Sequence, residues 1–139
     1  MNEDLCRARR LLEEEKYTCV LCCGHEVHTS TARGVRPLLE LPQKDWSRFS
    51  AADKVIGKAT AFLYVHLGIR AVYAPVISQA ALLILQRSGI EVFFDMVVPA
   101  IFNRSRTGFC PMETAVKDID DLDEALIAIH ELCQKLHNG

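Results

Sequence analysis

Cysteine and histidine side chains gather near the start of the chain, in the stretch "YTCVLCCGHEVH" at 17–28. A Cys-x-x-Cys followed by glycine is typical of half a structural zinc site, whose other half is normally a second Cys-x-x-Cys or a histidine pair. Cys110 and Cys133 are isolated in the sequence and do not supply that second half. In an extended strand, Cys19 and Cys22 would also point to opposite faces, about 10 Å apart. We therefore predict no metal here and assign these thiols to packing.

A second set of reactive groups lies in the stretch "NRSRTGFCPME" at 103–113. Cys110 precedes a proline suited to the first position of a helix, and a thiol at a helix start has its thiolate stabilised by the helix dipole. Nearby guanidinium groups would act in the same direction and can bind an anion through their forked donors. The sequence allows two interpretations of Cys110, as a reactive thiol or as a structural one. We take Cys110 as a candidate catalytic residue, and Asn103 and Arg104 as candidate ligand contacts.

Helix starts provide a third kind of candidate site, because their free amides and dipole attract phosphate or carboxylate groups. The sequence predicts one helix over Ser50–Gly68, capped by Ser50, and a later helix capped by Ser78. We take Ser50, Lys54 and Ser78 as candidate ligand contacts, and Asp53 as a candidate catalytic carboxyl. The alternative interpretation is that Asp53 is only a helix cap and Lys54 only a solvated charge.

Hydrophobic periodicity and turn residues predict the elements that would position these groups. The first half of the chain should contain an amphipathic helix, an antiparallel hairpin with a glycine turn, and a basic loop leading into one or two helical turns. A longer helix follows, apolar around most of its circumference and therefore expected at the centre of the protein. These elements are predicted over Asn2–Glu15, Lys16–Cys22 with Glu26–Ser30, Arg33–Leu41 and Ser50–Gly68.

The second half of the chain reads as a strand, a helix and a strand, an order that should form a parallel, right-handed βαβ unit. Two further helical segments follow a loop. These elements are predicted over Ala71–Ile77, Ser78–Ser88, Glu91–Val98, Pro111–Asp118 and Leu122–Leu136. The whole chain, 1–139, is thus predicted to be a single α/β domain.

Composition narrows the class of protein. The chain has 139 residues, half of them apolar, and a net charge of −2. Neither nucleic acid nor a membrane is therefore an expected partner. The longest apolar run, at 71–85, is broken by Pro75 and is too short to cross a bilayer, and the charged N-terminus lacks an export signal. We expect a cytoplasmic protein with reduced thiols and no cofactor. Assembly into a homo-oligomer stays open.

Four phrases together resemble an uncharacterised prokaryotic domain-of-unknown-function family in the cytidine deaminase-like superfamily. They are "YTCVLC", "RGVRPLLEL", "SAADKVIGKATAFLYVHLGIRAVYAPVIS" and "NRSRTGFCPMETAVKDIDD". The resemblance implies a three-layer αβα sandwich whose mixed sheet contains a hairpin followed by a parallel βαβ unit. Zinc deaminases of that superfamily open the central helix with His or Cys and a nearby Glu, and the next helix with Pro-Cys-x-x-Cys. The stretches here are Ser50-Ala-Ala-Asp53 and Ser78-Gln-Ala-Ala81, so a zinc-dependent deaminase is not expected.

These observations predict a site more clearly than a reaction. In the resemblance, both helix starts point into one crevice, where a small anionic or nucleotide-like metabolite would bind, with Cys110 as a candidate reactive group. Whether the protein is an enzyme stays open. The alternative is a non-catalytic regulatory or protein-interaction module in which the crevice is vestigial.

Overall fold

The sheet at the centre of the protein is mixed and contains six strands. The computed structural model describes residues 1–101 and 111–138. The helices are α1 (Glu3–Glu14), α2 (Arg36–Leu39), α3 (Lys58–Leu67), α4 (Gln79–Arg87), α5 (Pro111–Val116) and α6 (Leu122–Asn138). The strands are β1 (Cys19–Cys23), β2 (Glu26–Ser30), β3 (Ser50–Asp53), β4 (Val55–Ile56), β5 (Ala71–Ser78) and β6 (Glu91–Val98).

The strands run in the order β2-β1-β3-β5, and β4 and β6 also pair with β5. β1 is antiparallel to both β2 and β3, whereas β3, β4 and β6 are all parallel to β5. β3 and β4 lie along β5 in one register, with Ser50 opposite Ala71 and Val55 opposite Val76. β3 and β4 are therefore consecutive segments of one strand, interrupted at Lys54.

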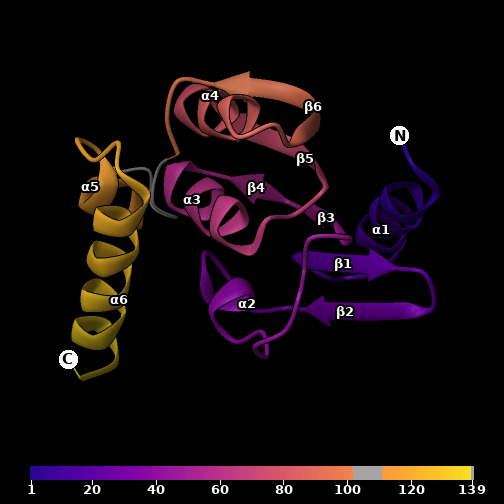
Figure 1. The fold of residues 1–139 in the computed structure, drawn as a ribbon, viewed down its shortest axis with the longest axis horizontal. Coiled ribbons are helices and arrows are strands. Elements are labelled where there is room, and N and C mark those ends of the chain that lie inside the picture. The colour runs from indigo at the N-terminus through magenta and orange to yellow at the C-terminus, as the bar shows by residue number, and fades with distance from the viewer. Residues whose placement is uncertain (102–110, 139) are drawn as a thin grey trace.

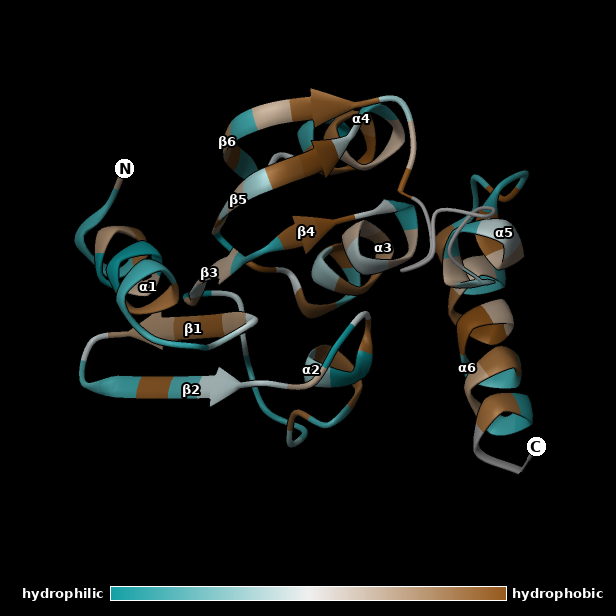
Figure 2. Cartoon of the chain, turned by 180° about the vertical axis from the view of Figure 1, so that it is seen from behind, coloured by the Kyte–Doolittle hydropathy of each residue, from teal (hydrophilic) through white to brown (hydrophobic). Residues whose placement is uncertain are grey.

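Helices pack on both faces of this sheet (Figure 1). On one face, α1 packs its buried leucines against Val20, Cys22 and Tyr73. On the other face, α3 and α4 share a larger core with Cys19 and Leu21. Adjacent residues of β1 thus enter different cores, as the alternation of side chains along a strand requires. Figure 2 shows β1 and β5 as mainly hydrophobic and β2 as largely polar, which fits the inner positions of β1 and β5 and the edge position of β2.

Several predicted elements are confirmed. The hairpin forms around Gly24, whose φ of +58° suits glycine, and Cys19 and Cys22 face opposite sides of the sheet. Ser78 caps α4 by accepting a hydrogen bond from the backbone N–H of Ala81. The βαβ unit β5-α4-β6 is parallel as predicted. The two C-terminal helices also begin where predicted, at Pro111 and at Leu122.

The predicted helix over Ser50–Gly68 is wrong in its first half. Residues 50–53 and 55–56 are strands, and α3 begins only at Lys58, although it ends as predicted at Gly68. The four residues of β3 are all buried because the strand runs between β1 and β5. A short apolar run covered on both faces has no alternation to distinguish it from a buried helix.

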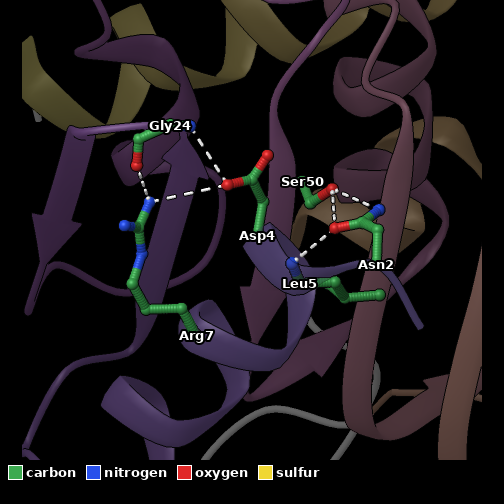
Figure 3. A network of polar contacts seen from close by, with 6 residues as sticks. All are labelled: Asn2, Asp4, Leu5, Arg7, Gly24 and Ser50. Carbon is green, nitrogen blue, oxygen red and sulfur yellow. Dashed lines mark hydrogen bonds and ion pairs between the residues drawn. The ribbon is translucent and has the colours of Figure 1, made fainter.

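Ser50 therefore caps no helix. Its hydroxyl oxygen accepts a hydrogen bond from the Asn2 amide at 3.0 Å, and Asn2 in turn caps α1 through the backbone N–H of Leu5 (Figure 3). A neighbouring pair ties α1 to the hairpin turn, since Asp4 accepts from the Gly24 N–H and Arg7 donates to the Gly24 carbonyl. These polar contacts attach α1 to the sheet.

Candidate ligand-binding cleft

A cleft of about 1300 Å³ opens where the sheet divides. β1 accompanies β3 as far as the pair Cys19–Asp53, and the backbone N–H of Lys54 donates to the carbonyl of Thr18. Beyond this point β4 pairs only with β5 among the described strands. The floor of the cleft is the sheet around Asp53–Val55. One wall is the segment 32–39 with α2, and the opposite wall is formed by α5, α6 and the start of α3.

Asp53 is a carboxyl group at the floor of this cleft and is only 7 % exposed. The Tyr64 hydroxyl donates to its Oδ2 at 2.8 Å, and the Val55 backbone N–H donates to the same carboxylate. The Tyr64 oxygen also lies 3.5 Å from the sulfur of Cys19. Burial raises the pKa of Asp53 to about 7, against the opposing effect of the two hydrogen bonds. A carboxyl with such a pKa can hold or release a proton near neutral pH, as an acid or base in a reaction must.

The start of α3 also faces the cleft, but two of its free backbone N–H groups are already paired. Gly57 is the N-cap residue and has no side chain to cap the helix. Instead Glu113 of α5 accepts from the backbone N–H of Lys58 at 2.6 Å, and the Ala59 N–H donates to the same carboxylate. Burial raises the pKa of Glu113, although these two bonds and the Lys58 charge oppose the rise. The protein's own carboxylate thus occupies the anion-binding end of α3.

Basic side chains line the solvent side of the cleft. Arg33, Arg36 and Lys54 are all exposed and all lie on its lining. Arg36 lies 3.7 Å from the carboxylate of Glu40, an exposed ion pair of small energetic weight. Lys58 is different, because its side chain is only 11 % exposed and its ammonium group donates to the carbonyl of Lys117 at 3.0 Å. The cleft therefore combines a carboxyl floor with three cations beside solvent.

Two of the predicted site residues, Asp53 and Lys54, line the cleft together. Ser50 lies at the other end of β3, bonded to Asn2, and Ser78 is buried as the cap of α4; neither is on the cleft lining. The predicted contacts Asn103 and Arg104 and the candidate nucleophile Cys110 lie outside the described residues.

Four further groups belong to the site and are not among the residues predicted from the sequence: Glu113, Gly57, Tyr64 and the partly buried Cys133 of α6. Cys133 and His130 lie one helical turn apart and both reach the lining, a spacing that could have indicated a shared face. The contacts of Tyr64 with Asp53, and of Glu113 with α3, join residues far apart in sequence and carry no local signal.

Among the described residues, no group of three or more His, Cys, Asp or Glu side chains is arranged to hold a metal ion. The start of α3 reads Gly57-Lys58-Ala59-Thr60, so the corrected helix start carries none of the deaminase zinc ligands. No helix in the described part of the chain has the length and apolarity needed to cross a bilayer.

Comparison with known families gives a match over residues 7–133 to a family model described as TM1506, a domain of unknown function (DUF1893). The chain belongs to this family. The crystal structure of a DUF1893 family protein, TM1506 from Thermotoga maritima at 2.70 Å resolution, is similar, with a TM-score of 0.86 and 24 % sequence identity. The alignment covers 94 % of this chain and 91 % of that one. Comparison with curated proteins gives no match.

These comparisons confirm the predicted membership of a family of unknown function and a shared α/β fold. At this level of identity the likeness concerns the fold alone. Placement of DUF1893 in the cytidine deaminase-like superfamily stays a prediction.

Proposed function

We propose that the cleft binds a small anionic or nucleotide-like metabolite, on a zinc-free scaffold of the cytidine deaminase-like kind. The observation that carries the proposal is the buried carboxyl of Asp53 at the floor of a large cleft whose solvent side holds Arg33, Arg36 and Lys54. A buried carboxyl that faces a cleft is a frequent mark of a functional site. The exposed cations offer the complementary charge for an anionic group.

The dimensions and walls of the cleft suit such a ligand. Small-molecule sites are typically about 300–1,000 Å³ with mostly apolar walls and a few placed polar groups, and this cleft is somewhat larger, at about 1300 Å³. Val35, Leu39, Ala59 and Met112 supply apolar surface for a ring. The ligand's anion would lie against Lys54 and the two arginines, because Glu113 already holds the α3 amides.

Asp53 is the proposed catalytic group if a reaction occurs. Its carboxyl would exchange a proton with the ligand, while the Tyr64 hydroxyl stabilises the ionised form by donating to Oδ2. Cys110 stays a proposed nucleophile on sequence grounds, since it directly precedes Pro111, which lies on the cleft lining. Asn103 and Arg104 stay proposed contacts on the same grounds, and Ser50 and Ser78 are proposed only as supports of β3 and α4.

Thermal unfolding with nucleoside phosphates and phosphorylated metabolites tests the proposal. A ligand at about 100 times its Kd adds about 2.7 kcal/mol to the stability, which for a domain of this size raises Tm by roughly 5–10 °C. Lys54→Met should reduce this shift, whereas Arg87→Met removes an exposed charge from α4, away from the cleft lining, and should not. Absence of any shift at millimolar concentration would exclude this class of ligand.

One observation favours the alternative, a regulatory or protein-interaction module with a vestigial cleft. The α3 amides that would bind a ligand anion are occupied by Glu113. The same titration separates the two proposals. A shift that is equal in the wild type and in Lys54→Met would place the ligand elsewhere and favour the alternative.

A further inference from the structure

One wall of the cleft is formed by α5 and α6, here called the C-terminal arm (Pro111–Asn138). Its apolar face packs against the core that contains α3, where Val116, Ala125 and Ile129 are fully buried. Hydrophobic contact is non-directional, so it specifies the position of the arm along α3 less strictly than hydrogen bonds do. Hydrogen bonds between the arm and α3 would therefore define the position of this wall more strictly.

Glu113 and Lys58 make directional contacts between the arm and α3. Glu113, in the first turn of α5, accepts the N–H groups of Lys58 and Ala59. Lys58 reaches back and donates from its ammonium group to the carbonyl of Lys117, just beyond the last turn of α5. Its Nζ also lies 3.8 Å from the exposed carboxylate of Asp120. The start of α3 therefore binds α5 at both ends.

Gly57 makes the Glu113 contact sterically feasible. A Cβ atom added at this position would lie 1.6 Å from Oε1 and 2.7 Å from the carboxyl carbon of Glu113, and 3.2 Å from a side-chain carbon of Ile101. The φ angle of Gly57 is −96°, which any residue can adopt. Glycine is thus required here by the close approach of the carboxylate and not by the backbone conformation.

We propose that Glu113 is a positioning residue that sets the wall of the cleft: its carboxylate, held against the start of α3 in the space left by Gly57, determines where the C-terminal arm lies. A buried hydrogen bond restricts the relative position of two helices more strictly than apolar packing does, because a buried donor left without its acceptor is costly. The inference rests on the proposed function only in giving the cleft a ligand. The position of the wall can be measured without one.

The thiol of Cys133 reports on that position. It lies on α6, lines the cleft and is partly buried against the core, so movement of the arm should expose it. Cys19 of β1 is fully buried against α3 and should react only when the whole domain unfolds. Alkylation rates of both thiols in the native protein, located by mass spectrometry, separate arm movement from global unfolding.

Gly57→Ala, Glu113→Ala and the double variant form a thermodynamic cycle. Gly57→Ala should raise the Cys133 alkylation rate at least about tenfold over the wild type, as expected for loss of one buried hydrogen bond. The Cys133 rate should also depend less steeply on sub-denaturing urea than the Cys19 rate, because movement of the arm exposes less surface than global unfolding. In the Glu113→Ala background the added methyl group has no carboxylate to displace and should have little further effect. Glu131→Ala removes an exposed carboxylate from the same arm and is the matched control.

Glu113→Gln covers the case in which Gly57→Ala does not fold. The amide keeps the shape of the side chain, but only one of its two polar ends can accept the N–H groups of Lys58 and Ala59. A smaller rise in the Cys133 rate than in Glu113→Ala is therefore expected. The proposal is overturned if Cys133 reacts at the wild-type rate in these variants, or if the Cys133 and Cys19 rates depend equally on urea, which would mean that Cys133 reacts only through global unfolding. A missing ligand response in the thermal titration would leave this result unaffected, so failure of one proposal is distinguishable from failure of the other.

Discussion

Replacing Asp53 by asparagine should change how the stability of the protein depends on pH. The carboxyl of Asp53 has an ordinary pKa of 3.8 in the unfolded chain and about 7 in the folded protein, because burial disfavours its charge. The folded state therefore binds this proton more tightly than the unfolded state. Its stabilising contribution is complete below pH 3.8 and is lost as the pH rises through 7.

The magnitude follows from the two pKa values. One pKa unit corresponds to about 1.4 kcal/mol, so the shift amounts to roughly 4 kcal/mol over the whole range, and about 2.5 kcal/mol of it falls between pH 5 and pH 8. Asparagine cannot ionise and lacks this dependence. The wild type should therefore lose about 2.5 kcal/mol more than Asp53→Asn between these two pH values.

The substituted side chain has partners in the folded protein. The amide oxygen can accept from the Val55 N–H, and its NH₂ group can donate to Tyr64, whose hydroxyl can turn to donate to the Cys19 sulfur 3.5 Å away. The variant should therefore fold. A large and pH-independent destabilisation would indicate that this rearrangement does not occur.

Urea unfolding at pH 5, 6, 7 and 8 measures the effect as a difference in free energy of unfolding between the two proteins. The matched control is Asp95→Asn, because Asp95 also accepts from a tyrosine, Tyr73 at 2.6 Å, but is exposed on β6. This control keeps the Asp53 carboxyl and should retain the loss of stability that Asp53 causes between pH 5 and pH 8. Parallel curves for the wild type and Asp53→Asn would refute the reasoning, since they would show that burial does not hold the Asp53 proton.

Two further substitutions test the contacts around the sheet. Tyr64→Phe removes the hydroxyl that donates to Asp53. We expect a loss of about 1–3 kcal/mol in the free energy of unfolding measured with urea, and a further rise in the pKa of Asp53 in an NMR titration. An unchanged titration would contradict the assigned hydrogen bond. Asn2→Ala removes both the α1 cap and the bond to Ser50, with an expected loss of about 1–2 kcal/mol. The exposed Glu14→Ala is its control, and equal effects would mean that the cap contributes nothing.

The predictions that hold are those that depend on neighbours in sequence. Gly24 allows the hairpin turn, Ser78 caps α4 three residues before its partner N–H, and Gly68 ends α3 with a φ of +70°. The apolar runs of β5 and β6 flank a helix of suitable length, and parallel pairing follows from the crossover between them. Each of these choices is made within a few residues, so a single sequence is enough to make it.

The segment 50–56, predicted as helix and found as strand, could not be assigned from neighbouring residues alone. Residues 50–56 contain small, apolar side chains that suit a helix as well as a buried strand. The strand wins because β1 and β5 lie on either side of it and pair with its backbone. Since propensity is a weak preference, such pairing overrides it, and the consequence for the site is large: Asp53 becomes a buried carboxyl at the end of a strand, not a solvated helix cap.

The types of chemical group at the site, a carboxyl at Asp53 and an amine at Lys54, could be named from the linear chain, as could the α/β class and the βαβ unit. The environment of those groups could not. Burial of Asp53 depends on Tyr64 from α3 and Cys19 from β1, and the anion-binding end of α3 is closed by Glu113, which lies 55 residues away in the chain. Desolvation and hydrogen bonding act through space, so the pKa of Asp53 and the occupation of α3 are set by the packing of distant elements.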